Sequence, residues 1–282
     1  PLLASATMGQ AAPLFDQIMA SNLYEGAVSS LNYADKLNTA LTQIFVYTIS
    51  ATALSSFSQL ISSGQIGRLK EQVNRIFSLY IALLLPLTVM IANLAPEIVK
   101  LFFERGAFGA ESTRYTSSAW AIYSLALYLA LCGTIMARVY NALQDARDQV
   151  IASLIGLAVH IGGNIAFMRL YGHNGIAFSA VLSTGVTTAL LYMLLRRRLG
   201  PIITSETAGT MIKVVGANVL LFVFASAIQG LYVPEGGIRL ALWLAAVATV
   251  CTGFVALSYR LLRIRLHVRR GGDRSERIRS EN

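Results

Sequence analysis

The sequence predicts an all-α integral membrane protein with about eight transmembrane helices. Hydrophobic residues make up 55% of the chain and charged residues only 13%, whereas soluble domains carry about 25% charged residues. Apolar stretches of about 20 residues, the length that crosses a bilayer as a helix, recur along the 282 residues. These observations exclude a soluble globular domain.

Eight segments have the length and the apolar composition of a membrane span. The second is rich in Ser and Thr, which suits helices that pack through small and polar residues. Pro86 lies inside the third and should kink it. A polar connection, 95–115, follows the third segment. The eight spans are expected at 1–20, 37–61, 73–94, 116–140, 149–170, 174–195, 211–232 and 238–262.

The chain starts at Pro1, without an initiator Met, a charged amino-terminal region or a signal-peptide cleavage site. Its first residues already lie in an apolar segment. We therefore expect this chain to be the later part of a longer protein.

The distribution of charge predicts the topology. If successive connections lie on opposite sides of the membrane, one side carries 17 of the 23 Lys and Arg residues and the other carries 6. The positive-inside rule then places the basic side, with the carboxyl terminus, in the cytoplasm and the Asp35–Lys36 end outside. The polar tail, 263–282, is expected to be disordered and to touch anionic membrane lipids. It has no aromatic residue to stack on bases, so no nucleic acid is expected as a partner.

The Asp35–Lys36 pair opens a segment, 37–61, that contains no Asp, Glu, Lys or Arg. An ionisable residue at a membrane boundary is a candidate functional residue, because its desolvation must be offset by a partner. The alternative is that Lys36 reaches the lipid headgroups and pairs with Asp35, with no further role. The residues alone leave both interpretations open.

Three stretches carry a family resemblance. They are SSLNYADKLNTALTQIF from Ser29, preceded by FDQIMASNLYEGAV; LFFERGAFGAEST from Leu101; and ARVYNALQDARDQV from Ala137. In this order and spacing they resemble the carboxyl-terminal half of the MurJ/MviN-type lipid II flippases of the MOP exporter superfamily. The resemblance covers the first six spans well and weakens over the last two.

The resemblance implies a fourteen-helix fold of which this chain supplies helices 7–14. Residues 1–200 would form the second six-helix bundle (the C-lobe), 201–262 two additional helices, and 263–282 a basic cytoplasmic tail. The partner bundle would belong to the missing amino-terminal half. The implied function is to flip lipid II, a peptidoglycan precursor on undecaprenyl diphosphate, from the inner to the outer leaflet of the bacterial cytoplasmic membrane by alternating access.

Family members line a cationic cavity with arginines that meet the substrate diphosphate. Lys36, beside Asp35, stands where the family has one such arginine. Lys keeps the positive charge but lacks the bidentate fork of Arg. This departure leaves two alternatives open: an exporter of another polyprenyl-diphosphate-linked glycan, such as an O-antigen-like one, and a transport-inactive scaffold in cell-wall assembly.

Asp16 lies within the first span, where a carboxylate must be neutral, paired or bound to a cation. The resemblance implies that this helix offers an acidic residue to a coupling cation. Asn164 could add an oxygen ligand, and His160 lies one turn earlier on the same helix face. Oxygen ligands suit Na⁺ and an imidazole suits H⁺, so coupling to Na⁺, to H⁺ or to the membrane potential stays open. The alternatives are an Asp16 at the membrane edge and a His160 hydrogen-bonded within the bundle.

Arg105, Asp145 and Arg147 are candidate gate or headgroup contacts. Arg105 lies in an outer loop and either touches the emerging headgroup or ties the loop to Glu104 or a helix end. Asp145 and Arg147 lie in a cytoplasmic turn, where they either complement a helix dipole or form a gate contact.

The chain contains no HExxH, GxSxG or Walker-type motif. We therefore expect a transporter rather than an enzyme, with no cofactor and no firm metal site. Cys132 and Cys251 fall in apolar runs far apart in the sequence, which predicts buried free thiols.

Overall fold

The computed structural model describes residues 12–234 and 237–262. Every regular element in these residues is an α-helix, which confirms the predicted all-α class. A helical segment, 12–20, precedes α2 (Ala27–Ser62), α3 (Ile66–Phe103), α4 (Ala110–Ser124), α5 (Leu127–Ala142), α6 (Arg147–Tyr171), α7 (His173–Leu199), α8 (Ser205–Leu231) and α9 (Gly237–Leu261).

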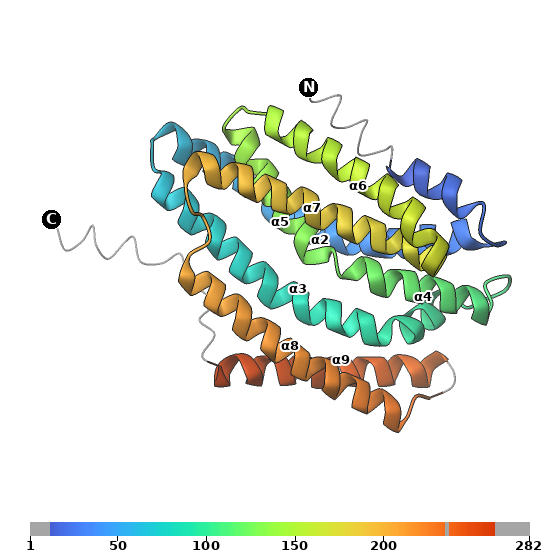
Figure 1. Ribbon diagram of the computed structural model, residues 1–282. Coiled ribbons are helices and arrows are strands. Elements are labelled where there is room, and N and C mark those ends of the chain that lie inside the picture. The colour runs from blue at the N-terminus through green and yellow to red at the C-terminus, as the bar shows by residue number, and fades with distance from the viewer. Residues whose placement is uncertain (1–11, 235–236, 263–282) are drawn as a thin grey trace.

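The helices run up and down between two ends of the molecule (Figure 1). The count of Lys and Arg on the two sides of the membrane assumed this alternation of successive connections. The alternation brings helix termini that carry basic residues, among them Arg68 of α3, Arg147 of α6 and Arg198 of α7, to one end. That end holds connections 63–65, 143–146 and 200–204 with the last turn of α9; the other end holds 21–26, 104–109 and Gly172.

Five helices in the described part of the chain are long and apolar enough to cross a membrane: α3, α6, α7, residues Thr207–Gly230 of α8, and α9. α4 and α5 together form a sixth span, bent by 45°. These six correspond to the third to eighth predicted spans. α2 covers the second predicted span. Most of the first predicted span, and the whole of 263–282, lies outside the described residues.

Two expected boundaries differ from the structure. α2 begins at Ala27, so Asp35 and Lys36 lie more than two turns inside a helix and not at its start. α3 continues to Phe103 and α4 begins at Ala110, which reduces the expected polar connection to residues 104–109. α3 contains both Pro86 and Pro96, and it curves along its length without a break (Figure 1).

The span formed by α4 and α5 is broken, although one continuous helix was expected there. Its tight turn places the N–H of Leu125 3.0 Å from the carbonyl of Ile122. Thr88 on α3 donates a hydrogen bond of 3.0 Å to the carbonyl of Ser124, the last residue of α4. Broken spans are tolerated where neighbouring helices satisfy the freed backbone groups.

α6 and α7 pack closely through small residues, as helices in lipid do. Ser183 donates a hydrogen bond of 2.8 Å to the carbonyl of Gly156 across the interface. At the start of α7, a Cβ added to Gly175 would lie 2.2 Å from the carbonyl oxygen of Phe167. Only a glycine allows this approach of the two backbones.

α8 and α9 pack against α3, on the side away from α6 (Figure 1). A buried apolar cluster joins the three helices and includes Leu94, Leu221, Ala225, Val247 and Cys251. Cys132 and Cys251 are both buried free thiols, as predicted.

Candidate functional site: an acidic pocket and an exposed cation on α2

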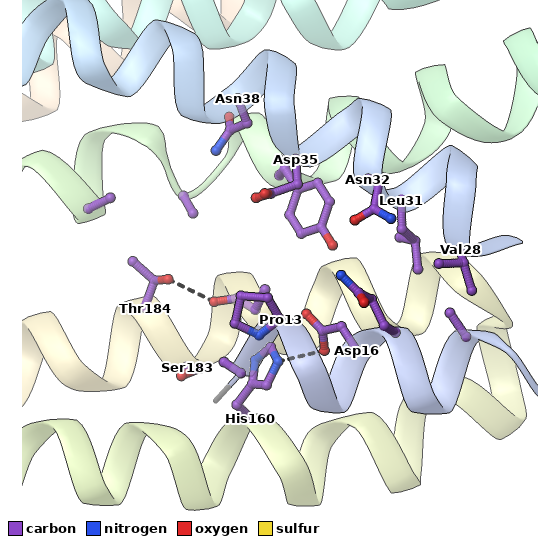
Figure 2. A pocket seen from close by; sticks show the side chains of 17 residues that line it. Pro13, Asp16, Val28, Leu31, Asn32, Asp35, Asn38, His160, Ser183 and Thr184 are labelled. Atoms are coloured by element: carbon purple, nitrogen blue, oxygen red, sulfur yellow. Dashed lines mark hydrogen bonds and ion pairs between the residues drawn. The ribbon is translucent and has the colours of Figure 1, made fainter. Parts of the chain in front are cut away.

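A pocket of about 290 Å³ lies between segment 12–20, α2, the α4–α5 break, α6 and α7 (Figure 2). Tyr123 and Ala126, at the α4–α5 break, are part of its lining. Broken helices often border the substrate or ion sites of transporters. The described polar lining consists of Asp16, Gln17, Asn32, Asp35, Asn38, Tyr123, His160, Ser183 and Thr184.

The structure brings together Asp16, His160 and Asn164. Oδ1 of Asp16 lies 2.7 Å from Nε2 of His160 and accepts a 2.7 Å hydrogen bond from Nδ2 of Asn164. His160 and Asn164 are one turn apart on α6 and are both buried, at 4% and 0% exposure. The carboxylate therefore joins segment 12–20 to α6, and both hydrogen-bond partners of its Oδ1 are nitrogen atoms.

Asp35 and Asn38 reach the same pocket from α2, on the face that also carries Leu31 (Figure 2). Positions three or four apart share one helix face, which explains why these three residues line it together. Oδ1 of Asn38 is buried and has no hydrogen-bond partner in the described residues. The pocket thus has an unused acceptor opposite the Asp16 cluster.

The charge of the described lining is acidic. It contains the carboxyl groups of Asp16 and Asp35 and the imidazole of His160, and no Lys or Arg. A lining of this kind attracts a proton or a small cation and repels a diphosphate. The described lining therefore offers no cationic side chain of Lys or Arg to an anionic headgroup.

Lys36 lies outside this pocket. It is exposed, and the ion pairs among the described residues do not include one between Lys36 and Asp35. Successive helix residues point about 100° apart, so these neighbours face different directions. The exposed residues Lys36, Thr39 and Gln43 form a polar stripe along α2 beside the pocket. Asp35 is exposed as well, but it lines the pocket and Lys36 does not.

The remaining candidates lie at the two ends of the molecule. Arg105 is exposed, and its Nη2 donates a 3.4 Å hydrogen bond to the carbonyl of Leu101 at the end of α3. Glu104 instead accepts a 2.7 Å hydrogen bond from Thr113 of α4. Of the loop contacts considered from the sequence, the structure contains the one between Arg105 and a helix end.

Asp145 takes part in a cluster that joins the α5–α6 turn to α7. Its Oδ1 accepts a 2.9 Å hydrogen bond from the backbone N–H of Arg147, and its Oδ2 pairs with the guanidinium of Arg198. Arg198 also lies 3.0 Å from Asp148. The hydrogen bond from Arg198, reinforced by the N–H of Arg147, holds the pKa of the Asp145 carboxyl below its usual value. The side chain of Arg147 is exposed.

Sequence reasoning missed several of these residues. Arg198 is one of three arginines in the last turn of α7, and the two acidic residues of the α5–α6 turn are a signal for a specific basic partner. Ser183 and Thr184 carry a weaker signal, because hydroxyl groups are frequent in α7. Tyr123 lines the pocket next to the α4–α5 break. The sequence at this break contains no Pro or Gly that would have predicted it.

Comparisons with known proteins place the chain in a family. Residues 1–249 match the family model described as "Lipid II flippase MurJ". A probable lipid II flippase MurJ of Bdellovibrio bacteriovorus is 24% identical over 262 residues, which cover 93% of this chain and 50% of that protein. The lipid II flippase MurJ of Burkholderia cenocepacia is 28% identical over 201 residues, or 70% of this chain and 38% of that protein. The chain thus spans about half the length of the Bdellovibrio relative and less than half the length of the Burkholderia relative.

Solved structures agree on the fold. A lipid II flippase MurJ in an inward closed conformation has a TM-score of 0.76 at 20% identity, over 93% of this chain and 53% of that one. A MOP superfamily transporter from Pyrococcus furiosus has a TM-score of 0.54 at 16% identity, over 94% of this chain and 64% of that one. With the family match covering residues 1–249, this multi-pass membrane chain belongs to the MurJ family of lipid II flippases.

Proposed function

We propose that this chain is the second lobe of a flippase that moves lipid II from the inner to the outer leaflet of the bacterial cytoplasmic membrane. The observation that carries the proposal is the family match over residues 1–249. The lobe works against a first lobe of the kind its longer relatives contain, by alternating access around a site between the two. The end of the molecule that is rich in Lys and Arg faces the cytoplasm, which the positive-inside rule supports.

The diphosphate of the lipid substrate is assigned to the stripe of α2 that contains Lys36, Thr39 and Gln43. When this chain is considered by itself, these side chains are exposed. Exposure of this kind suits a surface that lines a cavity shared with another lobe. Lys36 supplies a point charge, and the hydroxyl and amide groups beside it supply hydrogen-bond donors. The acidic pocket cannot take this role, because its two carboxyl groups repel an anion.

The acidic pocket is assigned to coupling by H⁺. The hydrogen-bond partners of Oδ1 of Asp16 are the imidazole Nε2 of His160 and the amide Nδ2 of Asn164, whereas Na⁺ prefers a shell of oxygen atoms. Carboxyl and imidazole side chains are the groups that form proton relays in membrane pumps and transporters. Protonation of Asp16 weakens its bonds to α6, and loss of the proton restores them.

A reconstitution experiment tests the flippase proposal. The full-length protein is placed in liposomes that contain either lipid II or an O-antigen-like glycan on the same undecaprenyl diphosphate, and the lipid that reaches the opposite leaflet is measured. Faster transfer of lipid II than of the other glycan supports the proposal. Faster transfer of the other glycan makes the protein an exporter of that class. If neither lipid is transferred faster than in protein-free liposomes, the flippase proposal fails and a transport-inactive scaffold is the remaining function.

A further inference from the structure

α3 crosses the bundle with two prolines inside it, Pro86 and Pro96. A proline has no backbone N–H, so it leaves the carbonyl four residues earlier without its helical donor. For Pro86 that carbonyl belongs to Ala82. Ala82 is 3% exposed and lies in a membrane-spanning helix, where an unsatisfied backbone group costs several kcal/mol.

The donor for this carbonyl comes from another helix. The hydroxyl of Tyr259 on α9 donates a hydrogen bond of 3.0 Å to the carbonyl of Ala82, 177 residues away in the sequence. The Tyr259 oxygen in turn accepts a 3.4 Å hydrogen bond from Nδ2 of Asn218 on α8. Asn218 is 3% exposed. One chain of hydrogen bonds therefore runs from α8 through α9 to the proline site of α3.

A second set of contacts holds α8 next to the other proline. Asn93, three residues before Pro96, accepts a 2.7 Å hydrogen bond at its side-chain oxygen from Ser226. Its backbone carbonyl accepts a hydrogen bond from the amide of Gln229, which also lies 3.4 Å from Glu97. Asn93 is itself buried. α8 and α9 thus contact α3 through polar groups beside both prolines.

We infer that α8 and α9 act as a clamp that fixes the bend of α3, with Tyr259 as the residue that replaces the donor lost at Pro86. The inference goes beyond the proposed function and does not rest on it. α3 also packs against α4, α5 and α2, so the shape that the clamp sets is transmitted to the helices around the pocket. Displacing the α8–α9 pair would free the carbonyl of Ala82 and loosen α3.

A double-mutant cycle tests the inference in the purified full-length protein. Tyr259→Phe removes the donor, and Pro86→Ala restores a backbone N–H to the Ala82 carbonyl. We expect Tyr259→Phe to lower the Tm by about 2–4 °C in the wild-type background and by less than half as much in the Pro86→Ala background. Equal losses in both backgrounds, or no loss in the wild type, would overturn the inference.

Thr252→Val is the matched control, because the Thr252 hydroxyl donates a hydrogen bond to the carbonyl of Ala248 in its own helix and is exposed. It should leave the Tm within about 1 °C of wild type, because substitutions at exposed positions usually change stability very little. Backbone amide exchange gives a second readout that needs no proline variant. Residues 83–90 should exchange faster in Tyr259→Phe than in Thr252→Val, and equal exchange in the two variants would also overturn the inference.

Discussion

Oδ1 of Asp16 lies 2.7 Å from Nε2 of His160, and the two residues are 144 positions apart in the sequence. The contact ties segment 12–20 to α6 at the edge of the acidic pocket. The Asp16 carboxylate is partly buried beside the buried imidazole of His160, and carboxyl and imidazole groups form the proton relays of membrane pumps and transporters. The pair is therefore the element through which a proton could bias the arrangement of these two helices.

Asp16 variants test whether the charge of this carboxylate is used. We expect Asp16→Asn and Asp16→Ala both to reduce lipid II transfer in liposomes by roughly 5- to 150-fold, the range of a coupling between two sites. Both should also abolish stimulation by an imposed pH gradient. Leu14→Ala, at an exposed residue of the same segment that does not line the pocket, is the control and should transfer at nearly the wild-type rate.

Full activity in Asp16→Asn with loss in Asp16→Ala would show that hydrogen bonding, and not charge, is what the site requires. Full activity in both would remove the pair from the mechanism. Stimulation of the wild type by a Na⁺ gradient at constant pH would contradict the assignment to H⁺.

Asp35 and Lys36 should behave differently although they are adjacent. Asp35 lines the acidic pocket, so Asp35→Asn should alter the response of transfer to the pH gradient. Lys36 lies outside the pocket, so Lys36→Gln should slow transfer equally at every gradient. Measuring transfer against imposed gradient for both variants separates the two sites, and the same response in both would mean that they form one site.

The fit between α6 and α7 predicts a sharp difference between two glycines. Gly175→Ala places a Cβ 2.2 Å from the carbonyl oxygen of Phe167, and the backbones must separate, at a cost of about 1–3 kcal/mol. Gly162→Ala on α6 meets nothing within 4 Å and should be neutral or stabilising by up to about 1 kcal/mol. Thermal unfolding in detergent checks both, and equal Tm values for the two variants would contradict the packing.

The Asp145–Arg198 pair predicts a pH-dependent contribution to stability. Because Arg198 lowers the pKa of Asp145 in the folded protein, the contribution is complete above the unfolded pKa of about 3.9. It is lost as the pH falls through the lower folded pKa. Asp145→Asn should therefore lower the Tm at pH 7, and the difference from wild type should shrink below about pH 4. Glu71→Gln, at an exposed residue of α3, should show no such trend.

Much of the fold could be predicted because bilayer thickness sets the length of every span. The clustering of Asp16, His160 and Asn164 was also foreseeable, since two of them share a helix face and the third is an acid in an apolar segment. The break between α4 and α5 was not, because residues 124–127 contain neither Pro nor Gly and the break depends on Thr88 of another helix. The hydrogen bond from Tyr259 to Ala82 likewise depends on how α9 packs.

Lys36 and Asp35 show a different limit. Their adjacency in the sequence suggested one paired unit, yet helical geometry directs adjacent side chains to different faces. Once α2 is known to begin at Ala27, their separation follows. The error came from placing the helix start at the pair itself.

The most direct test of the central claim is genetic. Bacterial cells are depleted of their own lipid II flippase and supplied with the full-length protein as wild type, Lys36→Arg or Lys36→Ala, with expression in the membrane matched. Wild type and Lys36→Arg should restore growth and outer-leaflet lipid II, and Lys36→Ala should fall short by roughly 10- to 100-fold in transfer, as expected for loss of a hydrogen bond to a charged group. Normal membrane levels of all three proteins with no restoration by any of them would contradict lipid II flipping.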